Sequence, residues 1–275
     1  MAISLPYQLT KTLLCALNEM QAITGVDPLY LTNTTLNSKY NIYPTTLPAA
    51  SPKLSFFGIG IRGFKNLDDE NLSAPYIPSS KNLDLYTPIP FRIVPIDDDL
   101  TPTERMNYRM RVMRTIGDES YWAYYLKKLE IIDNRVKIIR TNITTGVEEV
   151  LDELDSSNLT PTPTVTSAEA VTQATEKISV SLSASINITG NEVIEAINVL
   201  YNGNLLRARV SEIGLYTAND QLVTMSDGLG GTFESNEAIF AALAYHYTNQ
   251  GINFSTPDAD ETMLLRLDSA SSFLV

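Results

Sequence analysis

The stretch Ile178-Ser-Val-Ser-Leu-Ser-Ala-Ser-Ile-Asn-Ile188 alternates apolar and polar residues without interruption. Side chains on a β-strand point to opposite faces in turn, so this period of two predicts a strand with one buried face and one hydroxyl-rich face. Thr189-Gly-Asn191 ends the pattern, and residues 192–201 then space their apolar side chains as in a helix that ends at Gly203. This region predicts a sheet with one short helix packed against it.

Most of the remaining sequence also predicts strands. Residues 106–145 are expected to form a β-meander whose first strand alternates apolar side chains with arginines. Residues 207–225 are expected to form a hairpin that turns at Ala218-Asn-Asp220, and residues 262–267 a final strand. Residues 238–247 fit either a strand or a helix. The predicted fold class is therefore mainly β, a β-sandwich or meander, with a few short helices.

Composition excludes several kinds of site. The 275 residues include one Cys and one His, too few for a disulfide framework, a thiolate zinc site or a multi-histidine metal site. The single His246 lies between two tyrosines without a nucleophile signature, which favours a packed or surface histidine. The net charge of −12 argues against nucleic acid as a partner. No stretch has the length of a transmembrane helix, and the N-terminus lacks the features of a signal peptide.

The charge also divides the chain. Sixteen of the 20 basic residues lie within 1–140, so the rest of the sequence is strongly acidic. A Thr- and Pro-rich segment follows this change and predicts an extended linker at residues 155–170. The predicted organisation is thus an N-terminal β-rich part, 1–154, and a C-terminal β-sandwich-like part, 171–275. The first part is expected to begin with a helix at residues 8–22, which would hold Cys15 as a core residue.

Two segments of the N-terminal part, residues 25–53 and 75–102, are expected to be extended arms. Prolines lack the N–H that a central strand needs, and the second arm holds several of them. Such segments are either disordered or laid across a neighbour, and partner subunits are the simplest neighbour. The candidate subunit contacts in this arm are Pro75, Pro78, Pro88 and Pro90.

Between the arms, Gly58-Ile-Gly60-Ile-Arg-Gly63 matches the dinucleotide-binding pattern G-x-G-x-x-G. That chemistry requires a helix N-terminus directly after the glycines to hold the pyrophosphate. No helical pattern follows, and the acidic residues 68–70 would repel phosphate. We therefore expect no cofactor here, but a glycine-bearing strand that another backbone approaches closely.

A basic cluster in the predicted meander is the second group of candidate subunit contacts. It consists of Arg105, Arg109, Arg111, Arg114, Lys127 and Lys128. Bases interleaved with tyrosines could bind single-stranded nucleic acid, or could form a plain solvated face, but nearby acids dilute the field. The acidic half of a neighbouring copy is the favoured partner, which predicts a head-to-tail oligomer that salt weakens.

No constellation indicates catalysis or metal binding. Asp227-Gly-Leu-Gly-Gly231 lacks the ligand spacing of a calcium loop. The 32 acidic residues allow many carboxylate pairs, but no spacing selects one. We expect no catalytic residue, no metal and no cofactor, and hence not an enzyme.

The segment Val210-Ser-Glu-Ile-Gly-Leu-Tyr-Thr-Ala-Asn-Asp-Gln-Leu-Val-Thr224 resembles a hairpin of tailed-bacteriophage tail-fibre and baseplate-attachment domains. The resemblance rests on Glu212, Gly214 and Tyr216. It implies a viral structural protein of the phage virion. Such a protein is expected to assemble in the host cytoplasm and to have no membrane partner. Its expected form is a homo-oligomeric ring or collar in the neck, tail or baseplate, in contact with copies of itself and other virion proteins.

The main alternative is a β-sandwich carbohydrate-binding, receptor-binding module. Tyr121, Trp122, Tyr124 and Tyr125 could supply a stacking platform for sugar rings. A buried Trp122 would exclude that platform.

Overall fold

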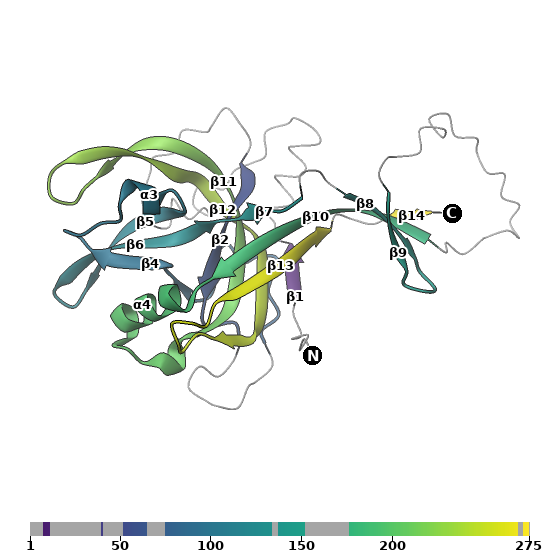
Figure 1. Cartoon of the computed structure of the whole chain (residues 1–275), viewed down its shortest axis with the longest axis horizontal. Helices are drawn as coiled ribbons and strands as arrows, with labels where there is room; N and C mark the ends of the chain where they lie inside the picture. The colour runs from purple at the N-terminus through teal and green to yellow at the C-terminus, as the bar shows by residue number, and fades with distance from the viewer. Residues whose placement is uncertain are drawn as a thin grey trace, which may run out of the picture. The chain divides into compact units, whose positions relative to one another are not determined.

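The computed structural model describes residues 8–11, 40, 52–64, 75–133, 137–151, 176–268 and 272–274. The chain divides into two compact units (Figure 1). The first comprises Met1–Leu129 and Asn187–Glu261, and the second Glu130–Ile186 and Thr262–Val275. Both are built on antiparallel sheets, which confirms the predicted mainly β fold class.

The first unit is built on an eight-stranded sheet. Its main path is β1-β12-β11-β2-β6-β4, with β3 beside β2 and β5 beside β6. The strand bounds are β1 Gln8–Lys11, β2 Lys53–Gly60, β3 Pro88–Ile89, β4 Arg92–Pro95, β5 Tyr108–Ile116, β6 Glu119–Lys128, β11 Arg209–Ser226 and β12 Thr232–Asn253. The unit also holds the short helices α3 Pro102–Arg105 and η3 Leu205–Arg207, and the longer α4 Gly190–Tyr201.

The core of this unit joins residues from both ends of the sequence. Phe56 and Leu126 on the N-terminal strands pack with Tyr216 and Leu243 on the C-terminal ones. Burying such large side chains contributes roughly 1.5–3 kcal/mol each to stability. The antiparallel pairing of β2 with β11 therefore makes one sheet out of two distant stretches of chain.

The second unit is built on a six-stranded sheet. Its strands are β7 Glu130–Ile131, β8 Lys137–Asn142, β9 Glu148–Leu151, β10 Glu176–Ile188, β13 Glu261–Asp268 and β14 Ser272–Leu274. The strands predicted at 178–188 and 262–267 are confirmed as β10 and β13. Ala184 and Ile186 are buried, as the period of two requires.

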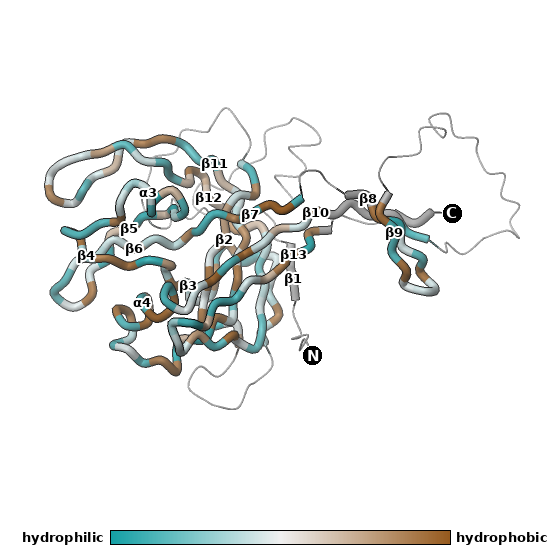
Figure 2. Tube along the Cα trace, in the orientation of Figure 1, coloured by the Kyte–Doolittle hydropathy of each residue, from teal (hydrophilic) through white to brown (hydrophobic). Residues whose placement is uncertain are grey.

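Helix α4 is also confirmed, and its ends show why it forms there. The Thr189 hydroxyl accepts the Glu192 N–H, and the Glu192 carboxylate accepts the Thr189 N–H, a reciprocal capping box. Asn202 ends the helix in the left-handed conformation, one residue before the predicted Gly203. Figure 2 shows both brown and teal segments along α4, and Val193 and Ile197 lie on its buried side.

Two local predictions are wrong. Residues Gln8–Lys11 form a strand that pairs with β12, not the start of a helix, and the rest of the predicted 8–22 helix, including Cys15, lies outside the described residues. The chain does not turn at residues 218–220, because β11 continues along β12 to Ser226↔Thr232 and the turn is residues 227–231. Residues 238–247, left open between strand and helix, belong to β12.

The two compact units also differ from the predicted division at 155–170. Residues 187–261 join the N-terminal segment because β11 pairs with β2 and β12 pairs with β1. Charge and composition along the sequence do not reveal such non-local pairing. Residues 155–170 themselves lie outside the described residues.

Candidate functional site: buried carboxylates around the β11–β12 hairpin

Glu212, near the start of β11, is the centre of the first cluster. Its side chain is fully buried and accepts three backbone N–H groups, from Arg62 at 3.1 Å, Tyr86 at 2.8 Å and Thr87 at 3.1 Å. Its Oε1 also lies 3.1 Å from Nε2 of His246 on β12. A buried carboxylate requires such donors, because burial without them costs several kcal/mol. Glu212 thereby fixes the segment around residues 86–87 to the sheet.

His246 is a packed histidine, one of the two predicted settings. It is fully buried beside Tyr86, with ring centroids 5.1 Å apart. Its Nδ1 lies 3.1 Å from the Asn82 amide nitrogen, which can only donate. The network therefore assigns Nδ1 as the acceptor and Nε2–H as the donor to Glu212.

Gly214 and Tyr216, the other two residues of the resembling hairpin, are packing residues. A Cβ at Gly214 would lie 2.7 Å from Leu243 Cδ1 and 2.7 Å from the Tyr216 ring, so no larger residue fits. The Tyr216 hydroxyl donates to Asp84 at 3.1 Å. Burial raises the pKa of Tyr216 well above its ordinary value. All three residues of the motif thus organise the interior of the sheet.

The glycine motif at 58–63 has the predicted close backbone approach. A Cβ at Gly63 would lie 2.0 Å from the Ser211 carbonyl oxygen, and one at Gly60 would lie 2.6 Å from the Glu212 carboxylate. The Gly63 N–H donates to the Ser211 hydroxyl at 2.8 Å. These glycines let the chain pass against β11 and deliver N–H groups to it.

A second buried carboxylate, Glu237 on β12, binds the backbone of β5 at the left-handed residue Met110. It accepts the N–H groups of Met110 at 2.5 Å, Arg111 at 3.1 Å and its neighbour Ala238 at 2.7 Å. Met110 has φ of 57°, in the left-handed region, so β5 is locally distorted there, although its register with β6 is unchanged from Arg109↔Leu126 to Arg111↔Tyr124. Burial raises the pKa of Glu237, and the three N–H groups oppose that shift.

Two arginines of the candidate basic cluster flank this left-handed residue. Arg109 and Arg111 are both buried, whereas the alternating pattern predicted an open cationic face. Arg109 makes a two-pronged ion pair with Asp220, at 2.6 Å and 2.9 Å, and its Nη1 donates to three backbone carbonyls. Buried inside their own chain, these two arginines cannot be the subunit contacts that were predicted.

Asp99 binds two arginines of the basic cluster. It accepts Arg111 at 2.8 Å, Arg105 at 3.2 Å and the Tyr124 hydroxyl at 2.6 Å. The Arg111 guanidinium also lies 3.3 Å from the centre of the Trp122 ring, a close cation–π contact. Burial raises the pKa of Tyr124, and its hydrogen bond to Asp99 raises it further.

The remaining basic candidates are only partly engaged. Lys127 pairs with Glu192 at 2.7 Å and is largely buried. Lys128 is 45% exposed and lies 3.8 Å from Asp220, and Arg114 is exposed on β5. Lys128 and Arg114 therefore stay candidate contacts, while Arg105 and Lys127 are neutralised within the chain.

The proline-rich segment 75–102 lies against its own sheet. It contributes β3 and β4, and both Ile89 and Phe91 are fully buried. Pro78 and Pro90 are buried, and Pro75 and Pro88 are partly buried. The segment is thus held in part by its own chain, where short strands and turns place its prolines at positions that need few ladder bonds. Its contact with partner subunits stays a prediction. Most of residues 25–53 lie outside the described residues, although Tyr40 stacks on Tyr125.

The aromatic platform of the carbohydrate-binding alternative is absent from the surface. Trp122 is 7% exposed, Tyr124 1% and Tyr125 5%. Arg111 covers the indole of Trp122, and the hairpin turn at Gly228 approaches its edge, since a Cβ there would lie 3.0 Å from Trp122 Cζ2. A sugar ring cannot stack on a buried indole.

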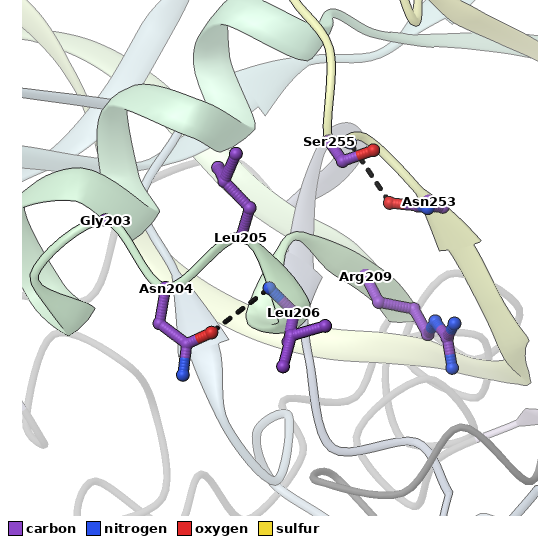
Figure 3. A pocket seen from close by; sticks show the side chains of 7 residues that line it. All are labelled: Gly203, Asn204, Leu205, Leu206, Arg209, Asn253 and Ser255. Atoms are coloured by element: carbon purple, nitrogen blue, oxygen red, sulfur yellow. Dashed lines mark hydrogen bonds between the residues drawn. The ribbon is translucent and has the colours of Figure 1, made fainter.

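One open depression lies where η3 meets β11 (Figure 3). It has a volume of about 360 Å³ and is lined by Gly203, Asn204, Leu205, Leu206, Arg209, Asn253 and Ser255. Its two asparagine side chains each accept a neighbouring backbone N–H, from Leu206 and Ser255. It therefore presents two leucines and an arginine, but no nucleophile beside a base.

The described ranges contain neither a metal-binding cluster nor a membrane-spanning helix. No three His, Cys, Asp or Glu side chains there lie close enough together to hold a metal ion. No helix there is long and apolar enough to span a membrane.

Sequence reasoning missed the carboxylates that organise this region. Asp99 ends the acidic run 97–99, which we interpreted as diluting the basic cluster, whereas it pairs with that cluster. Glu237 stands directly before the apolar run Ala238-Ile-Phe-Ala-Ala242, and a lone carboxylate at the head of such a run was the available signal. The partners of both are distant in sequence, so the pattern alone could not identify them.

Comparison with known proteins gives a family but no function. No curated protein and no solved structure shows significant similarity to the chain. Residues 3–268 match the model of DUF7208, a family of unknown function. Because this match spans nearly the whole sequence, the chain belongs to the DUF7208 family.

Proposed function

We propose that this protein is a non-enzymatic structural subunit of a phage virion, which forms an oligomeric ring or collar in the neck, tail or baseplate. The proposal rests on one observation: the buried ionisable groups of the protein bind its own backbone and side chains. Glu212 and Glu237 each accept three backbone N–H groups, and Asp99 neutralises two arginines. These groups fix backbone and side chains in place, which is the chemistry of a rigid building block.

The resembling hairpin supports the same proposal. Glu212, Gly214 and Tyr216, on which the likeness to phage attachment domains rests, are all buried and all hold the sheet together. The motif therefore acts as an architectural signature and has no exposed reactive group. This is consistent with a structural role.

The structure changes the expected nature of the contact between copies. Arg105, Arg109, Arg111 and Lys127 pair with acids of their own chain, so they are not available to the acidic surface of a neighbour. Exposed ion pairs contribute little and are screened by salt. We therefore now expect an oligomer whose mass changes little with salt, in place of the strongly salt-sensitive one.

Light scattering on the purified full chain, at micromolar concentration and from about 0.05 to 1 M salt, tests the oligomer. Negative-stain electron microscopy of the same samples should show closed particles of uniform diameter. Mass spectrometry of virions of a phage that encodes the chain should detect it in several copies per particle. A monomer under all conditions, together with its absence from virions, would overturn the proposal.

A further inference from the structure

The β11–β12 hairpin extends beyond the rest of its sheet as a two-stranded ribbon. The pairing of β11 with β2 ends at Ala218↔Lys53, while its pairing with β12 continues to Ser226↔Thr232. Figure 1 shows this part as a curved ribbon. In the described part of the chain, one edge of β11 over Asp220–Ser226 therefore has no strand beside it.

The backbone groups on that edge can be assigned from the ladder. The Asp227 N–H donates to the Gly231 carbonyl at 3.0 Å, which marks this pair as hydrogen-bonded. Antiparallel pairs alternate between bonded and non-bonded, so Met225 and Val223 bond to β12, and Leu222 and Thr224 direct their N–H and C=O groups outward. No hydrogen bond among the described residues satisfies the outward groups of Leu222 and Thr224.

Other edges of the same sheet are protected. On β4 the Ile93 N–H donates to the Glu195 carboxylate at 2.6 Å, and Pro95 ends the strand. On β5 the carboxylate of Glu237 accepts the N–H groups of Met110 and Arg111. Strand β1 is four residues long and ends in Lys11. Carboxylate caps, prolines, bulges, lysines and short length are the usual devices that prevent edge pairing.

From Gln221 to Met225 the β11 edge has none of these devices. At its end, the Ser226 carbonyl accepts Nη1 of Arg111 at 2.7 Å. Gln221–Ser226 contains no charged residue, no proline and no glycine, and the Leu222 side chain is 66% exposed. A long, uncharged edge with free backbone groups is a template for a further strand. Because this edge can pair with an identical edge, a second copy of the chain can supply the further strand.

We infer that this edge pairs antiparallel with the same edge of a second copy, about a two-fold axis at Val223. In that register the outward groups of Leu222 face those of Thr224 in the partner copy, and each Asp220 faces a Ser226. No two like charges are then opposed, which an edge between two acidic chains requires. The contact is isologous, so it closes at two copies and would join subunits of the proposed assembly in pairs.

The inference requires that the protein forms the oligomer of the proposed function. It does not require that this oligomer belongs to a virion. The test compares Leu222→Lys and Leu222→Pro with Leu229→Lys in the full chain. Leu229 is 69% exposed in the turn of the same hairpin but lies off the free edge, so it is the matched control. Proline at 222 removes only an outward N–H and leaves the ladder with β12 intact.

Sedimentation equilibrium at micromolar protein is the readout, with circular dichroism and Trp122 emission confirming that each variant folds. Both Leu222 variants should halve the mass of the oligomer, and Leu229→Lys should leave it unchanged. Hydrogen exchange at the Leu222 and Thr224 amides should slow as protein concentration rises.

The outcomes separate the two proposals. A wild-type oligomer whose mass persists in both Leu222 variants overturns the edge pairing and leaves the ring standing. A wild-type dimer that both variants split supports the edge pairing and overturns the ring. A wild-type monomer overturns both.

Discussion

Removing the carboxylate of Glu212 should destabilise the protein strongly. In Glu212→Ala, the N–H groups of Arg62, Tyr86 and Thr87 lose their acceptor, as does Nε2 of His246. A buried donor left without a partner costs about 1–3 kcal/mol, and water entering the vacated space recovers part of this for the less buried ones. We expect a loss of about 3–5 kcal/mol in the free energy of unfolding, the range measured for breaking buried charged networks.

The geometry also predicts a graded result for Glu212→Gln. Oε2 accepts two of the three N–H groups and Oε1 accepts Tyr86 N–H and faces His246, so an amide oxygen at the Oε2 position keeps two backbone bonds. The amide nitrogen would face Tyr86 N–H, donor against donor. The loss should therefore be about 1–3 kcal/mol, clearly smaller than for alanine.

Urea unfolding monitored by fluorescence measures both variants, since Trp122 is the single tryptophan of the chain. Glu234→Ala is the matched control, because Glu234 is an exposed β12 carboxylate that accepts only the Thr224 hydroxyl. It should change stability by less than about 0.5 kcal/mol. Hydrogen exchange at Tyr86 and Thr87 should accelerate in Glu212→Ala. If that variant unfolds at the wild-type urea concentration, Glu212 does not anchor this segment and the reasoning fails.

Three further predictions follow from the same contacts. Gly63→Ala places a Cβ 2.0 Å from a backbone oxygen and should cost at least about 3 kcal/mol in urea unfolding, whereas Gly117→Ala, at φ +61° with open space around it, should cost about 1–2 kcal/mol. For Glu237 the folded pKa is raised, so its contribution to stability is present below the ordinary glutamate pKa of 4.5 and is lost as pH rises through the raised value. The wild-type unfolding midpoint should therefore fall relative to Glu237→Gln as the pH rises above 4.5, and the opposite slope would contradict the assignment. Arg111→Ala should uncover the indole of Trp122, so acrylamide should quench its emission more strongly than in the wild type; equal quenching would mean that other groups bury it.

The elements that sequence predicted well are those whose signals are local. The alternation at 178–188 depends only on neighbouring residues, and it is strand β10. The helix after it begins with a capping box that spans three residues, Thr189 to Glu192. Its end shifted by one residue because Asn202 adopts the left-handed conformation before Gly203 does.

The predictions that failed depended on distant residues. The alternating arginines of β5 predicted a cationic face, but Arg109 and Arg111 are buried on either side of the left-handed Met110. The N–H of Met110 donates to Glu237, which is 127 residues away. The stretch Ala218-Asn-Asp220 suggested a turn, but Asp220 pairs with Arg109 while the strand continues beside β12. Turn-forming residues predict a turn only where the partner strand ends. Where that strand ends depends on residues distant in the sequence.

The charge asymmetry of the sequence has a different meaning in the folded chain. Opposite charges on the two halves suggested that one copy meets the next through charge. The fold instead places residues 187–261 beside the N-terminal segment, so Asp220 and Glu192 from the acidic half neutralise Arg109 and Lys127 from the basic half. Attraction that is satisfied within a chain cannot also join two chains. If copies of this protein associate, the contact must come from unsatisfied groups, and the backbone edge at Leu222 and Thr224 is the place where the described structure offers them.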